Sequence, residues 1–295
     1  MMYKIFRTEL YKTLTGYGFY LCAFFTVILC FNTGIYHDSI NNNYSVIRSI
    51  TLFDRNYMLS NTDFSSINVA LKGAGSWFTM FIPIISAFPF IPLVCDESES
   101  NSIRNVIFRL TRFSYSLSKF IVACLSGGLA VTLGYLVYIG FSFAVFPDIN
   151  TYSLELREIY LESLSYAYPN IYKYGTSSTL IIKCTEIFIY GAFNAIPSIL
   201  LTAISKNKYI IMCIPFFLKY FLTQTSAKLL AQAYSNFDNI DEKLIKFSDI
   251  INPDSILNIY ETVEKEIIIS YNITLVICAL IFYVIIQLRR FDCGK

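Results

Sequence analysis

Residues 120–146 read FIVACLSGGLAVTLGYLVYIGFSFAVF, a run without a charged side chain. An α-helix rises about 1.5 Å per residue, so about twenty apolar residues match the roughly 30 Å hydrocarbon thickness of a bilayer. The chain of 295 residues is 55% hydrophobic and only 15% charged, which is more apolar surface than one soluble core of this length hides. The run therefore predicts a transmembrane helix, and the composition predicts further ones.

Five more apolar windows give the predicted fold class, an all-α polytopic membrane protein with six transmembrane helices in one domain spanning residues 1–295. The first span is expected to remain as an anchor, because no small-x-small cleavage site follows Phe31. The fifth is expected to end early, tilt or break, because the chain turns polar after Leu222. The five windows lie near residues 17–36, 76–95, 178–204, 209–223 and 267–287.

Prolines inside three of these windows predict kinks that neighbouring helices tolerate, in preference to gating hinges. They are Pro83, Pro89 and Pro92 in the second span, Pro197 in the fourth and Pro215 in the fifth. The eight cysteines show no paired spacing in the loops and are expected to be small buried apolar residues rather than disulfides or metal ligands.

The distribution of basic residues predicts the orientation of the chain, because Lys and Arg resist translocation. With the N-terminus inside, the inner segments 1–16, 96–119, 205–208 and 288–295 hold twelve basic and five acidic residues. The outer segments hold nine basic and fifteen acidic residues. We therefore expect both termini to be cytoplasmic, in a bacterial cytoplasmic membrane.

The predicted outer loops are long and contain no catalytic motif. Residues 37–75 are rich in Asn and Ser and are expected to be partly irregular, whereas Leu154 to Glu162 interleave apolar and acidic residues as in a short surface helix. The third loop covers residues 224–266. We expect no separate soluble domain.

Residues 2–14 predict a helix lying in the membrane interface. At 100° per residue, Tyr3, Phe6 and Leu10 share one face with Leu14, and basic residues lie on the other. The alternative is a charged start to the first spanning helix.

A second amphipathic helix is predicted at about residues 100–111, between the second and third spans. Its apolar face consists of Ile103, Val106, Ile107 and Leu110, and its polar face of Arg104, Asn105, Arg109 and Arg112. Acidic residues precede it and basic ones end it, which suits the helix dipole. Such a helix requires the membrane surface or a groove on a partner protein.

These two cytoplasmic elements resemble the ABC transporter permeases of the second membrane type (ABC-2). The opening YKIFRTELYK at residues 3–12 is similar to the short basic helix that leads into the first span of that family. Asp96-Glu97, Ser102-Ile103-Arg104-Asn105, Ser116 and Lys119 resemble its coupling-helix region. The resemblance covers the layout of the whole chain but specific residues at only about 35 positions. It departs at Leu110-Thr111-Arg112, where the family often has a proline, and this leaves the end of the helix open.

The resemblance implies a permease subunit of an ABC exporter that has no cofactor of its own. A separate cytoplasmic ABC ATPase would bind ATP, and a second copy or paralogue of the permease would complete the path as a dimer. No GxxxxGK[ST] motif occurs in the chain. The implied contacts with the ATPase are Ile103, Val106, Ile107 and Leu110 in its groove, with Arg104 and Arg109 at the rim.

Three charged residues fall inside predicted spans, where a charge costs about 2.5 to 3.5 kcal/mol and usually faces a partner or water. Lys183 and Glu186 lie in the fourth span and Lys219 in the fifth. Counting residues from the ends of the spans places Glu186 and Lys219 at the same depth, so we expect these two to pair, with a substrate or ion site as the alternative. Lys183 is expected to snorkel to the outer surface.

Two other functions compete with transport. An intramembrane enzyme would need clustered histidines, paired carboxylates or a Ser/Lys dyad, but the only histidine is His37 and no two acidic residues share a span, so no catalytic or metal residues are predicted. A non-transporting peptide-immunity or sensing subunit on the same scaffold stays open. Nucleic acid is not an expected partner, whereas the lipid bilayer is.

Overall fold

The computed structural model describes residues 2–37, 42–100, 112–205, 207–235, 241–258 and 265–288, which are mostly helical. The elements of residues 2–99 are α1 (Met2–Thr15), α2 (Tyr17–Phe31), β1 (Gly34–His37), β2 (Asn43–Ser45), α3 (Val46–Leu52), α4 (Arg55–Ser60), η1 (Thr62–Phe64), α5 (Ser66–Lys72), α6 (Ser76–Ile85) and α7 (Ile91–Glu99). They are followed by α9 (Arg112–Val145), η2 (Ile149–Thr151), α10 (Leu154–Ala167), α11 (Pro169–Thr202), α12 (Lys208–Ala233), α13 (Glu242–Ile251), η3 (Pro253–Asn258) and α14 (Lys265–Leu288).

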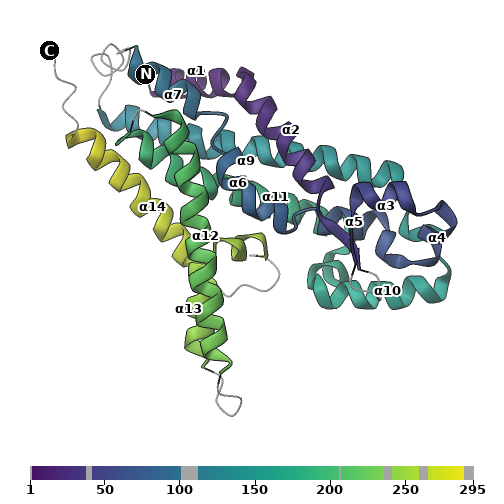
Figure 1. Cartoon of the computed structure of the whole chain (residues 1–295). Coiled ribbons are helices and arrows are strands. Elements are labelled where there is room, and N and C mark those ends of the chain that lie inside the picture. Colours follow the sequence, from purple (N-terminus) through teal and green to yellow (C-terminus); the bar gives the residue numbers. More distant parts are fainter. Residues whose placement is uncertain are drawn as a thin grey trace.

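The long helix α9 runs through the middle of the molecule and packs against α1, α2, α11 and α14 (Figure 1). Small residues allow close packing of α9 against α11. A Cβ added to Gly128 would lie 2.7 Å from the carbonyl oxygen of Phe188, and one added to Gly191 would lie 3.1 Å from the Cα of Gly128. Close contact of helix backbones at small residues is typical of helix packing in membranes.

Four helical segments of the described chain are long and apolar enough to cross a membrane, and they indicate a helical membrane protein. A fifth is added if α1 and α2, which meet at a bend of 52°, are taken as one segment. The four are Arg112–Thr151, Gly175–Thr202, Lys208–Ala233 and Ile267–Ile286.

Three of the predicted spans, 120–146, 178–204 and 267–287, fall largely on the helices α9, α11 and α14. The early end expected of the fifth span after Leu222 is wrong, because α12 continues as one helix to Ala233. Pro197 and Pro215 both lie inside continuous helices, and the break in α11 occurs instead at Gly175, whose φ is 80°.

The first two predicted spans are shorter in the structure than in the sequence analysis. The last three residues of the first window, 34–36, belong to strand β1 rather than to a helix. The second window is divided into α6 and α7 by turns at residues 86–90, with Pro89 in the turns and Pro92 in the first turn of α7. The prolines therefore end one helix and begin another, which is more than the predicted kink.

In its described residues, 42–75, the first predicted outer loop forms β2, α3, α4, η1 and α5, which with β1 make a cap at the end of the molecule away from α1 and α7 (Figure 1). β1 and β2 pair antiparallel, with Tyr36 opposite Tyr44. The buried Tyr135 and Tyr138 of α9 donate hydrogen bonds to the carbonyl oxygens of Ala70 (2.6 Å) and Val69 (2.8 Å), which fastens α5 to the end of α9.

The predicted surface helix at 154–162 is confirmed as part of α10, which completes this cap. Burial, followed by the nearby Asp63 carboxylate, raises the pKa of Tyr152 to about 12. The phenol therefore stays protonated and donates to the carbonyl oxygen of Met58 at 3.1 Å.

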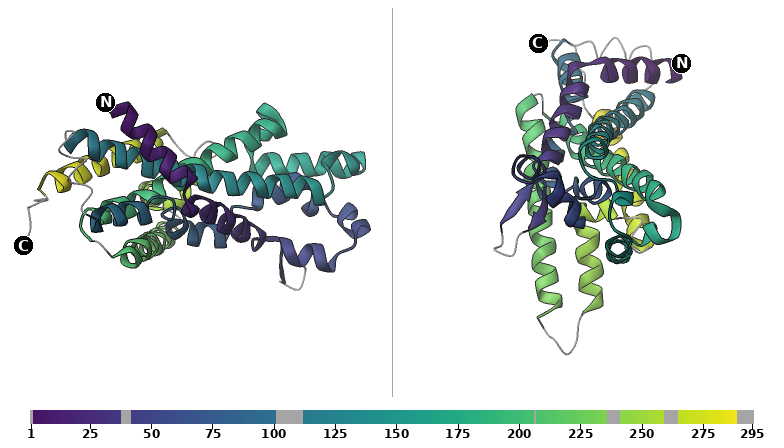
Figure 2. Two further views of the ribbon diagram at one scale, coloured as in Figure 1. Left: turned by 90° about the horizontal axis from the view of Figure 1, so that it is seen from above. Right: turned by 90° about the vertical axis from the view of Figure 1, so that its right-hand side faces the viewer.

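Helices α12 and α13 form an antiparallel pair that projects from the rest of the molecule (Figure 2). Ser226 and Ser248 join them through a 2.8 Å contact between their buried hydroxyl groups. After α13 the chain returns to the bundle as η3, which packs against α11 and α12. The return places η3 beside the charged residues of the predicted spans.

Candidate functional site

The first buried ion-pair network, here called the N-terminal cluster, consists of Glu9, Lys12, Glu97 and Lys119. The ammonium of Lys119, whose side chain is 6% exposed, donates to Glu9 of α1 and to Oε2 of Glu97 in α7 at 2.6 Å. Lys119 thereby joins three helices, although it is 110 residues from Glu9 in sequence.

The ion pairs of the N-terminal cluster join two carboxylates and two ammonium groups. Burying Lys119 alone would be costly, because desolvation of an ammonium is offset only by close partners of opposite charge. Two carboxylates share this one ammonium, and Lys12 adds a second cation 3.6 Å from Glu9. Lys208 at the start of α12 also pairs with Asp96 of α7. Ion pairs therefore fix α1, α7, α9 and the start of α12 to one another.

The predicted contacts with an ATPase lie outside the described residues, so they stay predictions. They are Ile103, Arg104, Val106, Ile107, Arg109 and Leu110. The structure does describe the two helices that flank them, α7 and α9, which the N-terminal cluster joins through Glu97 and Lys119.

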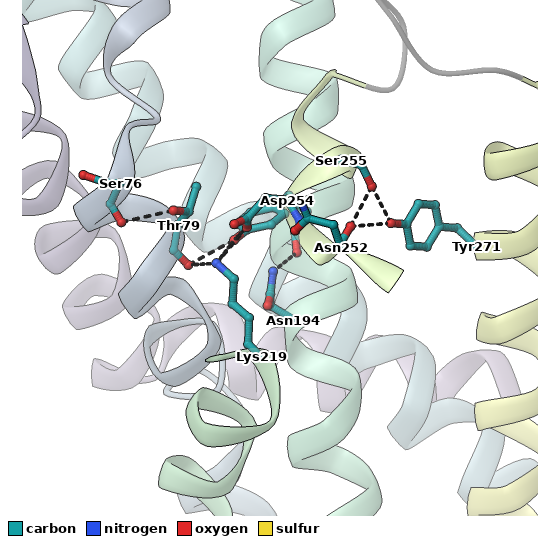
Figure 3. Close-up of polar contacts among 9 residues, drawn as sticks. Ser76, Thr79, Asn194, Lys219, Asn252, Asp254, Ser255 and Tyr271 are labelled. Atoms are coloured by element: carbon teal, nitrogen blue, oxygen red, sulfur yellow. Dashed lines mark hydrogen bonds and ion pairs between the residues drawn. The ribbon is translucent and has the colours of Figure 1, made fainter. Parts of the chain in front are cut away.

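The second network, here called the η3 network, surrounds Lys219 of α12. Its ammonium lies 2.8 Å from Oδ1 of Asp254 in η3, donates to Tyr190 Oη of α11 at 2.6 Å and donates to the carbonyl oxygen of Thr79 in α6 (Figure 3). Tyr190 is fully buried and lies 2.8 Å from the same carboxylate oxygen, to which it donates. The pair predicted between Lys219 and Glu186 is therefore wrong.

Lys183 occupies the same network from α11. It is 4% exposed and lies 3.1 Å from Oε2 of Glu186, one helical turn away. Its ammonium also donates to the carbonyl oxygen of Leu257 at 2.5 Å and to Oδ1 of Asn258 at 3.2 Å. The expectation that Lys183 snorkels to the surface is wrong, because η3 covers it.

The residue that sequence reasoning missed is Asp254. It lies in the segment predicted as an outer loop, where an acidic residue is ordinary. A Pro253-Asp254 sequence carries no signal for burial, and the distance to Lys219 depends on the return of the chain after α13. Asn252 and Ser255 hold this return in place, since Tyr271 of α14 donates to the carbonyl oxygen of Asn252 at 2.7 Å and contacts Ser255 at 2.6 Å (Figure 3).

Two apolar cavities lie beside the η3 network. One of about 370 Å³ lies between α11, α12, the end of α13, η3 and α14, and Lys219 is the one charged side chain among its described lining residues. A larger cavity of about 720 Å³ lies between α9, α11 and α14. Phe193 and Tyr271, whose rings are 5.5 Å apart, line both cavities.

Among the residues that the structure describes, no group of three or more His, Cys, Asp and Glu side chains is placed to hold a metal ion. Comparison of the chain with models of known protein families and with curated protein sequences found no match.

Proposed function

We propose that the chain is the membrane-spanning permease subunit of an ABC exporter, driven by ATP that a separate subunit binds and hydrolyses. The observation that carries the proposal is the N-terminal cluster. The segments whose sequences resemble the permease family are 3–12, 96–105 and 116–119, and residues of all three meet in this cluster. A resemblance carried by dispersed residues gains weight when the fold brings those residues into contact.

The proposal also assigns a role to the ion pairs of the cluster. A helix that receives a push from an ATPase moves the spans as rigid bodies only if its two ends are fixed to them. Lys119 joins the end of α7 to the start of α9 and both to α1. In this proposal the chain crosses the membrane six times, in α2, in α6 with α7, and in α9, α11, α12 and α14. The end of α7 and the start of α12, which the pair of Asp96 and Lys208 joins, then face the cytoplasm.

The proposal is tested by co-purification with an ABC ATPase subunit that carries a GxxxxGK[ST] motif. Burying an apolar side chain is worth about 1.5 to 3 kcal/mol, so Ile107→Asp is expected to reduce the amount of ATPase recovered by about tenfold or more. The matched rim variant Arg109→Ala is expected to lose much less.

The rival interpretation places the same helix face on lipid headgroups. It expects Ile107→Asp to disturb insertion or stability while leaving ATPase recovery per folded molecule unchanged. Recovery is therefore normalised to folded, monodisperse protein. An unchanged normalised recovery would contradict the proposed docking.

A further inference from the structure

Two buried ammonium groups from different helices converge on the six residues of η3. Lys219 of α12 contacts the carboxylate of Asp254, and Lys183 of α11 contacts the carbonyl oxygen of Leu257 and the side chain of Asn258. Apart from η3, Lys183 keeps the carboxylate of Glu186 as its partner. Lys219 keeps only the neutral oxygens of Tyr190 and Thr79. Asp254 is therefore the group that neutralises Lys219.

The Lys219–Asp254 pair lies between two cavities. Lys219 lines the apolar cavity of about 370 Å³, and both residues line a smaller one of about 100 Å³. The side chain of Asp254 is 26% exposed, compared with 8% for Lys219. The carboxylate is thus the accessible member of the pair, and it lies on a single short 3₁₀ helix, whereas Lys219 lies within the 26 residues of α12.

We propose that the cavity of about 370 Å³ binds a single-chain amphiphile with one anionic group, a carboxylate that takes the place of Asp254 on Lys219. Asp254 is then an internal counter-ion that occupies the site when the ligand is absent. The lining of this cavity is apolar apart from Lys219 and a few polar groups, so it suits the hydrocarbon chain of the ligand. Its volume falls within the roughly 300–1,000 Å³ that is usual for ligand cavities. A larger apolar cavity of about 720 Å³ lies next to this one and shares Phe193 and Tyr271 with it.

The depth of Lys219 favours a ligand that enters the site over a bilayer lipid. Lys219 lies eleven residues after Lys208, or about 16 Å along α12, which is near the middle of that helix. A phospholipid headgroup stays at the membrane surface. A cationic ligand is disfavoured, because it would have to displace Lys219, which is held by three oxygen atoms from three other elements.

This inference rests on the proposed permease function, since such an amphiphile would be its substrate class. The experiment uses the full chain alone in phosphatidylcholine nanodiscs and measures binding of tritiated dodecanoate. Because no ATPase is present, a negative result would overturn the ligand assignment and leave co-purification to decide the permease function.

The two members of the ion pair are expected to have opposite effects. Lys219→Met is expected to weaken dodecanoate binding at least tenfold. Asp254→Asn removes the internal competitor and is expected to strengthen it about tenfold, because the apparent dissociation constant falls as the fraction of open sites rises. Lys208→Met removes a lysine whose pair with Asp96 lies elsewhere, so its binding is expected to match that of the unmodified chain.

A purely structural ion pair would make Lys219→Met and Asp254→Asn weaken binding alike, and this outcome would overturn the proposal. Competition on the unmodified chain provides a test that needs no variant. Unlabelled dodecanoate is expected to displace the probe, and dodecanol and dodecyltrimethylammonium to fail. Equal displacement by dodecanol, stronger displacement by the cation, or loss of binding when phosphatidylglycerol is added to the nanodiscs would each contradict the assignment.

Discussion

Lys119 shows what a single buried charge can determine at the scale of the residue. Replacing it with methionine removes the cation that Glu9 and Glu97 share, whose side chains are 13% and 21% exposed. We expect Lys119→Met to lower the free energy of unfolding by about 1.5–3 kcal/mol, which is typical of losing hydrogen bonds between charged groups. SDS-induced unfolding of the purified protein measures this change.

The control for this prediction is Lys12→Met. Lys12 belongs to the same cluster, but its side chain is 51% exposed and 3.6 Å from Glu9, so its loss is expected to cost less than about 1 kcal/mol. Equal destabilisation by the two variants would show that the buried position of Lys119 between two carboxylates adds no stability.

Gly175 carries a second prediction at this scale. Its φ of 80° and ψ of 170° lie in a region that only glycine adopts readily, and a Cβ added there meets no atom within 4 Å. Gly175→Ala is therefore expected to destabilise the protein by about 1–3 kcal/mol through the backbone alone. Gly140 of α9 also has open space around its Cα but lies within a regular helix, so Gly140→Ala is expected to stabilise by about 0.5–1 kcal/mol. Two changes of the same sign would refute this reasoning.

Which charges pair could not be predicted from the sequence. Depth along a span placed Glu186 level with Lys219, yet a lysine pairs with whichever carboxylate the tertiary fold brings within reach. For Lys219 this is Asp254, and for Lys119 it includes Glu9 at a separation of 110 residues. Residue type identified the charges that needed partners, but their partners depend on contacts between distant segments.

At the scale of the element, long and mostly apolar windows predicted helices. The helices α9, α11 and α14 correspond to windows of twenty or more mostly apolar residues, and α11 stays helical through Lys183, Glu186 and Pro197. The region 76–95 has the same composition, but its prolines break it into α6 and α7. The polar residues after Leu222 led to the opposite error, because they predicted a helix that ends too early. α13 packs against α12 and helps to keep it helical to Ala233. Proline decided the first case and tertiary packing the second.

The packing of α9 against α11 yields a prediction for these elements. Gly128→Leu would place a side chain where a Cβ already comes within 2.7 Å of the Phe188 backbone, so the helices must separate. We expect the variant to lose most of its monodisperse fraction in size-exclusion chromatography. Gly140→Leu adds the same side chain to the same helix at a position with open space, and it is expected to elute normally. Normal elution of Gly128→Leu would mean that this contact tolerates expansion.

At the scale of the whole molecule, the charge asymmetry predicts that residues 96–119 and both termini face the cytoplasm. In a cysteine-free background, a cysteine at Ser102 is expected to react with an impermeant maleimide only after the cells are permeabilised. A cysteine at Glu155, on the exposed surface of α10, is expected to react in intact cells. Strong labelling of the Ser102 position from outside would reverse the proposed orientation.

The central claim is that this chain forms one half of a transport path and that a paired ATPase drives it. The stoichiometry of the assembly tests this claim most directly, because the proposed six spans would supply half of such a path and the proposed ATPases would act as a pair. Native mass spectrometry of the complex purified from its own membrane is expected to show two permease chains, identical or paralogous, with two ATPase subunits that carry a GxxxxGK[ST] motif. A folded chain that is monomeric in every gentle extraction, without an ATPase or with only one bound, would contradict the account.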